Sequence, residues 1–485
     1  MSARSLKLAG LDLSAPNDLR KLGDALLMAA LAGSLLLLPL ILWKKPELVW
    51  VVPAIVVAGA LVVALFRHPL LNLGVLLAGI VVVSDYEPGI QAREVLYGLY
   101  YLGFLAHFFF TRIILRGERL FRRPEEKALA LFMLGITASI GLTILWDGDM
   151  KEVLSQWTAL VLLLLYFPVK EAFVRYPKAP VVLVVVIGWI GVFAAVRNLL
   201  VYQAILSEAS QLWQVARNRV ITNDGLLMVS ALTMLVALLF TERWMARIAM
   251  LGVFLVVFAG LILTQSRGFW VGFLVGSFVL LVALKRRHRI RLITFVSVSA
   301  AVAVLVGFAF FKDYMLLIIG GLGARFGTLQ TAVTEDVSLV NRFIESGAVL
   351  EKIYRNPIAG YGMGVPFRMY DMTFTATRED TFIHNGYISV WYRFGLWGLG
   401  CLLVVYGATV LRAARSLRGN IEVLTRICGT AALVALVAYS LPAITSNPFH
   451  LNDGLFIYGV LFGMAAGAAE RAQLQAPLDE MSLVR

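Results

Sequence analysis

Apolar runs long enough to cross a membrane recur along almost the whole chain, separated by short polar connections. A helix of about 20 apolar residues spans the hydrocarbon core of a bilayer, so each run predicts one membrane-spanning helix. We expect about 14 (roughly 12 to 14) such helices, which makes the predicted fold class an all-α, polytopic transmembrane bundle. They are expected over residues 24–43, 47–66, 69–84, 95–111, 127–146, 153–172, 179–203, 223–241, 246–264, 268–284, 292–311, 386–411, 424–443 and 454–470.

One connection, residues 312–385, is much longer than the others, and loops of that length are usually functional. Within it, residues 339–354 place apolar side chains at helical spacing, which predicts an amphipathic helix. Its charged side is expected to carry Arg342, Glu345, Glu351 and Lys352. The apolar side is expected to rest on the outer membrane–water boundary. Asn356-Pro357 should end this helix, and the glycines of GYGMG at 360–364 should form a turn where backbone can approach a ligand closely.

The composition supports a membrane protein and indicates its orientation. Hydrophobic residues make up 60% of the chain and charged residues 15%, which excludes an ordinary soluble protein. The net charge of +13 would suggest nucleic-acid binding in a soluble protein, but here basic residues report the cytoplasmic side, and no nucleic-acid partner is expected. About 27 of the 43 lysines and arginines lie on the side of the N-terminus, so both termini are expected in the cytoplasm. The expected division is a cytoplasmic leader (1–23), eleven helices (24–311), a periplasmic loop (312–385), three helices (386–470) and a cytoplasmic tail (471–485).

Ionisable residues at the outer membrane boundary are the candidate functional groups, because charge is costly there. Arg267 lies in the tight outer turn TQSRGFW, and its guanidinium suits bidentate contact with phosphate oxygens. Arg217 and Arg219 precede the eighth helix, His384 lies where the long loop re-enters the membrane, and Arg393 follows about two and a half turns deeper. A lone arginine is most often a lipid-headgroup anchor, and a lone histidine is most often structural. Together they predict an electropositive outer pocket for a polyanion, phosphate above all.

Several short motifs follow one another in a fixed order between about residues 200 and 410. They are R-x-x-x-N before the eighth helix, T-x-SRG-x-W, NRF-x-E, I-x-x-NP-I-x-GYG-x-G, H-N-x-Y and G-L-x-G-L. This ordered set resembles the O-antigen ligase and O-antigen polymerase superfamily. The resemblance implies a multi-pass glycosyltransferase of the bacterial inner membrane, with a periplasmic active site and neither a metal nor another cofactor. Its implied partners are an undecaprenyl-diphosphate-linked glycan donor, an acceptor that is lipid A–core or a lipid-linked glycan, and membrane lipids.

The resemblance also implies roles for individual residues. Arg219 and Arg267 would hold the diphosphate, with Arg217 an alternative to Arg219, and His384 would act as the base on the acceptor hydroxyl. The same motifs offer further substrate-binding candidates, namely Arg342, Asn385, Tyr387 and Arg393. Relatives often carry an acidic residue after H-N-x-Y where this chain has Arg393, which leaves the nature of the acceptor open.

The proposed chemistry needs cations for the leaving diphosphate and a neutral imidazole for the acceptor proton. Asp380 lies four residues before His384, a spacing that would orient a ring nitrogen if the segment were helical; a solvated loop acid is the alternative.

The sequence favours a ligase that moves a finished glycan to lipid A–core, with a polymerase joining lipid-linked repeat units as the alternative. A metal-dependent membrane glycosyltransferase is a more distant alternative, for which Asp147-Gly148-Asp149 offers a carboxylate pair. A transporter of lipid-linked glycans would also have many spans and intramembrane arginines such as Arg197. It would more naturally show paired broken helices at matched positions, and the sequence shows no such pair.

Overall fold

The computed structural model describes residues 7–8, 11–12, 51–83, 91–208, 223–297, 337–372, 374–417, 419 and 421–482. These residues are mostly helical and divide into two compact units, one of residues 1–79 with 89–122 and one of residues 80–88 with 123–485. The helix expected over 24–43 lies outside the described residues, as does most of the one expected over 292–311.

The smaller unit contains a pair of packed helices. Its elements are β1 (Lys7–Leu8), β2 (Leu11–Asp12), α2 (Val51–Arg67), α3 (Pro69–Val83) up to Gly79, α4 (Ala92–Phe109) and the π-helix η2 (Phe110–Leu115). The Tyr97 hydroxyl of α4 donates to the Leu76 carbonyl of α3 at 2.8 Å. Gly79 leaves room for this ring, since a Cβ there would lie 2.8 Å from the Tyr97 Cε2 atom. The bounds of α2, α3 and α4 agree with the apolar runs that predicted them.

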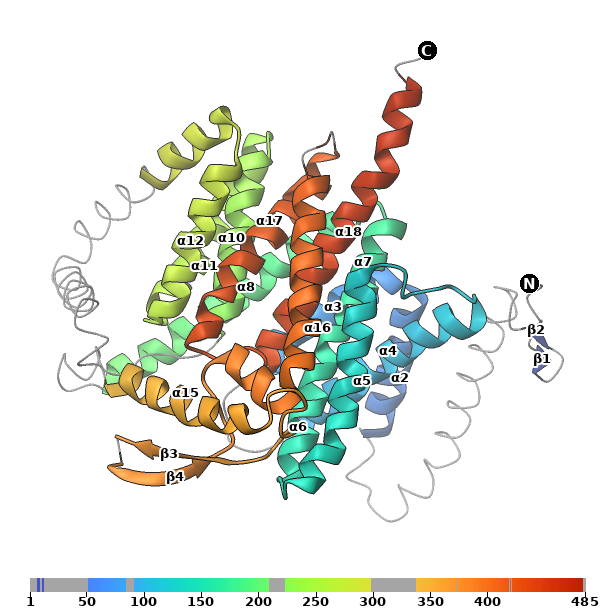
Figure 1. Cartoon of the computed structure of the whole chain (residues 1–485). Helices are drawn as coiled ribbons and strands as arrows, with labels where there is room; N and C mark the ends of the chain where they lie inside the picture. The colour runs from blue at the N-terminus through green and yellow to red at the C-terminus, as the bar shows by residue number, and fades with distance from the viewer. Residues whose placement is uncertain are drawn as a thin grey trace. The chain divides into compact units, whose positions relative to one another are not determined.

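The larger unit holds the remaining elements (Figure 1). Most of its apolar helices follow the predicted runs, but α18 continues to Ser482 through most of the expected tail, and the β3–β4 hairpin was not predicted by the all-α fold class. They are α5 (Pro124–Leu145), α6 (Met150–Leu160), η3 (Val161–Leu165), α7 (Tyr166–Arg175), α8 (Ala179–Glu208), α10 (Asp224–Phe240), α11 (Trp244–Leu263), α12 (Arg267–Ala283), α15 (Val337–Arg355), β3 (Phe367–Asp371), β4 (Ala376–Asp380), α16 (Gly386–Ser416), α17 (Val423–Ser440), η4 (Pro442–Ile444) and α18 (Asn452–Ser482). Within the described ranges, eight helical segments are long and apolar enough to cross a membrane, and α3, α10 and α12 are shorter apolar helices. The total of about 14 spans stays a prediction.

Helix α18 packs closely against α7 and η3 through small residues. Gly459, Gly463 and Gly467 recur every four residues and therefore lie on one face of α18. A Cβ at Gly459 would lie 2.5 Å from the Leu162 carbonyl oxygen, and one at Gly463 would lie 2.7 Å from the Val169 Cβ. Small residues at such spacing let backbones approach, which is how membrane helices gain packing contacts.

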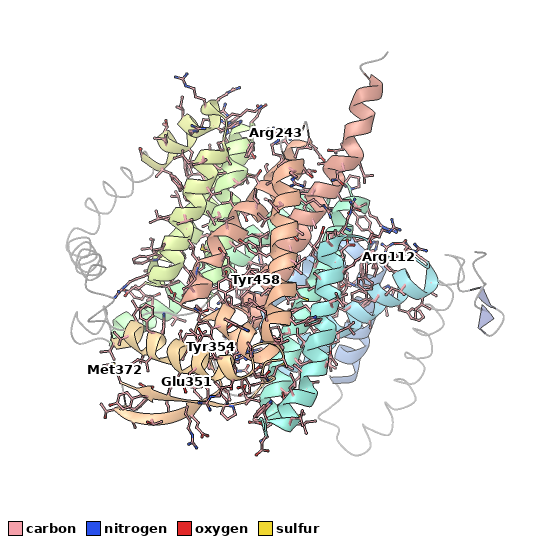
Figure 2. All side chains as sticks on the ribbon, in the orientation of Figure 1. Arg112, Arg243, Glu351, Tyr354, Met372 and Tyr458 are labelled. Atoms are coloured by element: carbon pink, nitrogen blue, oxygen red, sulfur yellow. The ribbon has the colours of Figure 1, made fainter. Side chains whose placement is uncertain are left out.

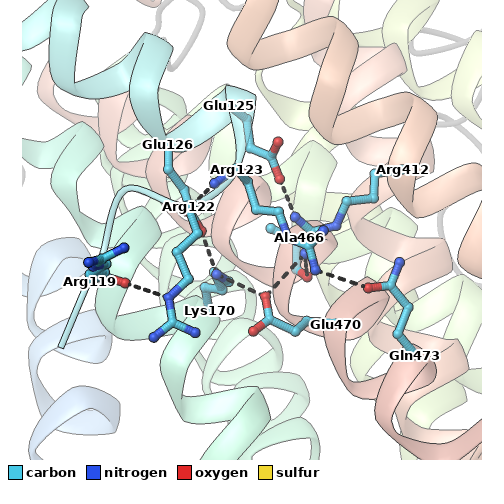
Figure 3. A network of polar contacts seen from close by, with 10 residues as sticks. All are labelled: Arg119, Arg122, Arg123, Glu125, Glu126, Lys170, Arg412, Ala466, Glu470 and Gln473. Atoms are coloured by element: carbon cyan, nitrogen blue, oxygen red, sulfur yellow. Dashed lines mark hydrogen bonds and ion pairs between the residues drawn. The ribbon is translucent and has the colours of Figure 1, made fainter.

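Partly buried ion pairs tie four helices together at the end of the bundle where α16 stops (Figure 3). Lys170 of α7 lies 2.5 Å from Glu126 of α5 and 2.9 Å from Glu470 of α18. Arg412 of α16 pairs with Glu125 of α5 and, at 3.3 Å, with Glu470. Two basic residues that the charge count assigned to the cytoplasmic side are therefore bound to carboxylates inside the protein.

Helix α15 lies across the helix ends at the other end of this unit, with the β3–β4 hairpin beyond it (Figure 1). Figure 2 shows Glu351 and Tyr354 of α15 far from Arg243, which precedes α11. The charge count assigns these two ends to opposite sides of the membrane, and that assignment stays a prediction.

The amphipathic helix expected over 339–354 is confirmed as α15, with two differences. Part of its apolar side packs on a core of its own formed by Val349, Ile353, Tyr361, Val365, Phe367, Met369, Ile383 and Tyr392. Phe343 does not pack on this core and stays 58% exposed. Only this unpacked part of the apolar side can rest on a membrane boundary. Glu345, expected on the charged side, is buried instead.

The GYGMG turn packs against α16 where that helix is interrupted. Helix α16 is non-helical at Gly395, where φ is 66°. The Gly362 N–H donates to the Arg393 carbonyl at 2.9 Å, and the Leu396 N–H donates to the Pro357 carbonyl at 2.8 Å. Gly362 has φ of 94°, and a Cβ there would lie 2.5 Å from the Thr143 hydroxyl of α5. We expected the backbone at these glycines to approach a ligand. In the structure it packs closely against the backbones of α5 and α16 instead.

Candidate active site

His384 lies directly before α16, where the chain returns to the helix bundle. Strand β4 ends at Asp380, and residues 381–385 have no regular structure. Asn385 is the N-cap of α16, and its side-chain oxygen accepts from the Tyr387 and Ile388 N–H groups at 3.1 Å each. An asparagine in this position satisfies N–H groups that have no partner inside the helix. Asn385 therefore fixes the start of α16, and His384 is the residue directly before it.

The Glu345 carboxylate of α15 holds His384 through two hydrogen bonds. Oε1 accepts from the His384 backbone N–H at 2.6 Å, and Oε2 lies 2.7 Å from Nδ1. Glu345 is 2% exposed, whereas the His384 side chain is 36% exposed. An ionised carboxylate only accepts hydrogen bonds, so Nδ1 carries the proton and Nε2 of the neutral ring can accept one. The pair resembles the carboxylate–imidazole arrangement that orients a general base.

Asp380, the acid expected to orient the ring, has different partners. The expectation required a helix between residues 380 and 384, and the structure has an irregular segment there. Asp380 Oδ1 accepts from the Phe382 N–H at 2.9 Å, and Oδ2 lies 3.1 Å from Arg378 Nη2. Glu345 in the NRF-x-E motif is therefore the acid at the ring, a residue that the sequence reasoning quoted but did not select.

Three of the expected substrate-binding residues have contacts within the protein. Asn385 caps α16 as described, and the Tyr387 hydroxyl donates to the Ser440 carbonyl of α17 at 3.0 Å. Arg393 is 3% exposed, and its Nη2 lies 3.2 Å from the Thr381 carbonyl. Arg342 lies three residues before Glu345 on α15, so the two side chains are neighbours on the helix surface.

Arg267 is the first residue of α12, directly after the turn that ends α11. The Trp270 indole N–H donates to the Leu261 carbonyl of α11 at 3.0 Å, and the Ser266 N–H donates to the Thr264 hydroxyl at 3.3 Å. The serine and tryptophan of T-x-SRG-x-W thus fix the turn that carries the arginine. The N-terminus of a helix adds partial positive charge to the guanidinium, which favours an anion.

One short connection, residues 441–451 between α17 and α18, lies beside the arginine turn and is hydrogen-bonded to the histidine segment. A Cβ on Gly268 would lie 3.6 Å from the Thr445 hydroxyl. The Asn447 side-chain N–H donates to the Ile383 carbonyl at 2.7 Å, directly before His384. The structure therefore brings the expected Arg267 and His384 to a common support, to which the sequence reasoning gave no role. Arg217 and Arg219 lie outside the described residues.

The acidic stretch at 147–149 forms a structural turn. Asp149 caps α6, and its Oδ1 accepts from the Lys151 N–H at 2.8 Å. The Asp149 N–H donates to the Gly364 carbonyl at 3.0 Å, which joins this turn to GYGMG. These contacts explain an aspartate at 149 through capping.

Comparison with known proteins finds a family match that covers part of the candidate active site. A family model described as O-antigen ligase matches residues 252–403, just under a third of the 485-residue chain. The matched segment contains Arg267, Arg342, Glu345 and His384. No curated protein matches the chain. The family match confirms, over residues 252–403, the resemblance to the O-antigen ligase and O-antigen polymerase superfamily that the ordered motifs predicted.

Proposed function

We propose that this protein transfers a glycan from undecaprenyl diphosphate to a hydroxyl group of lipid A–core, on the periplasmic face of the bacterial inner membrane. The family match supports O-antigen ligase or polymerase-type glycosyl transfer in general. The observation that carries the proposal is the buried Glu345 carboxylate that holds the half-exposed imidazole of His384 within the matched segment. A polymerase that joins lipid-linked repeat units would use the same chemistry on a different acceptor.

In this proposal His384 is the general base. The acceptor hydroxyl gives its proton to Nε2 while its oxygen attacks the anomeric carbon of the donor glycan. The resulting imidazolium keeps its Nδ1–H on Glu345, so the carboxylate stabilises the positive charge as it forms. Glu345 also fixes the ring by binding the His384 backbone, which reduces the orientations that the base can adopt.

Arginines stabilise the leaving group in this proposal. The bond between the anomeric carbon and the diphosphate oxygen breaks, and its electron pair leaves with undecaprenyl diphosphate. Arg267 and one of Arg219 or Arg217 would hold the charged oxygens, and the α12 N-terminus would add to the field at Arg267. Arg342, beside Glu345, is proposed as a further contact to the donor. The negative charge is balanced by side chains, so the scheme uses neither a metal nor another cofactor.

Reconstituted transfer is the direct test. The purified protein in lipid nanodiscs should move a labelled glycan from undecaprenyl diphosphate to lipid A–core and should keep its rate in excess chelator. Loss of activity in chelator would instead favour the metal-dependent alternative, and donor flux across a vesicle without bond cleavage would favour a transporter.

A deletion strain separates the ligase from the polymerase. A ligase predicts that long glycans accumulate on undecaprenyl diphosphate when the protein is absent. Loss of the long chains themselves would show a polymerase. Normal lipopolysaccharide and normal lipid-linked glycans in that strain would contradict both assignments.

A further inference from the structure

The loop segment that carries His384 is held by two buried side chains from other elements. Arg393 of α16 lies 3.2 Å from the Thr381 carbonyl, and Asn447 of the 441–451 connection donates to the Ile383 carbonyl at 2.7 Å. Arg393 is 3% exposed and Asn447 is 0% exposed. Burial of a guanidinium or an amide is costly unless its hydrogen bonds are made, so both side chains are committed to this segment.

His450 is part of the same arrangement. Its Nδ1 lies 3.0 Å from Arg393 Nη2. A guanidinium only donates, so Nδ1 accepts, and the ring is neutral with its proton on Nε2. Burial, and secondarily the charge of Arg393, lowers the pKa of His450 to about 3, which agrees with a neutral ring.

An aromatic contact connects His450 to the proposed base. The Phe382 ring lies 4.9 Å from the His450 ring at 90° and 4.9 Å from the His384 ring at 89°. Edge-to-face pairs at this distance are favourable and directional. A shift of His450 would therefore move Phe382 and, through it, the imidazole of His384.

We propose that Arg393, Asn447 and His450 are positioning residues that fix segment 381–384 so that the His384 imidazole faces the donor held at the Arg267 turn. The inference rests on the proposed function in taking His384 as the base. Asn447 belongs to the connection whose Thr445 also lies beside Gly268, so one short segment borders both the base and the arginine turn. Arg393 then acts through the protein and does not contact the substrate.

Kinetic constants distinguish positioning from substrate binding. Asn447→Asp keeps the size of the side chain but sets a carboxylate oxygen against the Ile383 carbonyl. We expect kcat to fall about 10-fold to 100-fold, because a misplaced base loses effective concentration, while the KM for the lipid-linked donor stays within about twofold. Arg393→Lys should behave similarly, because a point charge cannot reproduce the fork. A large rise in donor or acceptor KM with unchanged kcat in Arg393→Lys would show that Arg393 binds substrate, and would overturn the proposal.

Two substitutions of His450 provide a rescue experiment. His450→Asn retains an oxygen near the position of Nδ1 that can accept from Arg393, whereas His450→Phe removes the acceptor. We expect His450→Asn to keep most of kcat and His450→Phe to lose about tenfold or more. Equal loss in both variants, or a pH–rate profile that loses a limb in His450→Asn, would show that His450 itself carries a proton, and would overturn the proposal.

Hydrogen exchange measures the positioning without any transfer reaction. The His384 N–H is bound to Glu345, so amide exchange in residues 381–385 should be slow in the wild type and about tenfold faster in Asn447→Asp and Arg393→Lys. The matched control is Arg355→Lys, an arginine of α15 whose side chain is 74% exposed, which should leave exchange and kinetics unchanged. Unchanged exchange in both test variants would refute the positioning role. If the wild type transfers no glycan, the proposed function fails, and the exchange data alone decide this inference.

Discussion

Glu345→Gln tests the proposed base most directly, because it changes one charge and no side-chain volume. The carboxylate accepts two hydrogen bonds from the same residue, at 2.6 Å and 2.7 Å. Glutamine has one accepting oxygen, so its amide group must face one of the two donors of His384. The variant loses a hydrogen bond to the ring or to the backbone, and it loses the negative charge that stabilises the imidazolium in either case.

The size of the effect follows from these two losses. General-base catalysis contributes about 10² to 10⁴-fold, and neutralising the acid that orients a catalytic imidazole can remove most of it. We therefore expect kcat to fall by about 10² to 10⁴-fold while donor KM changes little, because the Arg267 turn is untouched. Glu345→Asp keeps the charge on a shorter side chain and should recover part of the lost rate.

The assay is transfer of a labelled glycan from undecaprenyl diphosphate to lipid A–core by protein in nanodiscs, with kcat and KM measured separately. The matched control is Glu351→Gln on the same helix, whose side chain is 75% exposed and pairs with Arg355. It should stay within about twofold of the wild type, as is usual for a surface ion pair. If Glu345→Gln keeps more than about a third of the wild-type kcat, Glu345 does not serve the base.

Four further predictions address other parts of the protein. Arg267→Ala should lower kcat/KM at least about 10²-fold with normal membrane insertion, and Arg267→Lys should restore little; wild-type turnover in either would remove Arg267 from the site. Lys170→Met removes the cation that pairs with the buried Glu126 carboxylate, whereas Glu470 keeps Arg412, and it should cost about 3–5 kcal/mol, seen as a lower apparent Tm. A cysteine introduced at exposed position 377 should react with impermeant reagents only from the periplasm, and one at exposed position 287 only from the cytoplasm. Reversed labelling would overturn the predicted orientation. Thermal stability should fall as pH drops below about 6.5, because the pKa of buried His450 is lowered to about 3 and the ring gains a proton on unfolding. In His450→Asn the free energy of unfolding should depend less on pH, by up to about 1.4 kcal/mol per pH unit.

The helices could be predicted from the sequence because their signal is local. An apolar run of about 20 residues specifies a spanning helix by its own composition, and the bounds of α5, α11 and α17 follow the runs to within a few residues. The amphipathic pattern of α15 is a local signal too. His384 and Arg267 were selected because charges at a membrane boundary are rare, and their roles stay predictions.

The supporting residues could not be predicted because their roles depend on contacts between distant segments. Glu345 has the helical position of a solvated acid, and it is buried because the segment 39 residues later folds over it. Asn447 and His450 lie in a connection with no charge pattern of its own, and they act through carbonyls and rings from the preceding loop. The break in α16 at Gly395 likewise exists because the GYGMG turn supplies hydrogen bonds there.

Direct displacement at an anomeric carbon sets a geometric requirement on such a site. The attacking hydroxyl and the leaving diphosphate lie on opposite sides of that carbon, so the base and the cations must face each other across the sugar at a fixed separation. Here the base lies beside an apolar core that the loop shares with Tyr392 of α16, whereas Arg267 begins α12. Several contacts join the two parts, among them the hydrogen bond from the Tyr387 hydroxyl to the Ser440 carbonyl of α17. Residues 441–451 lie beside Gly268 and bind the Ile383 carbonyl, so under the proposed function a change in this connection should alter the chemical step before it alters donor binding.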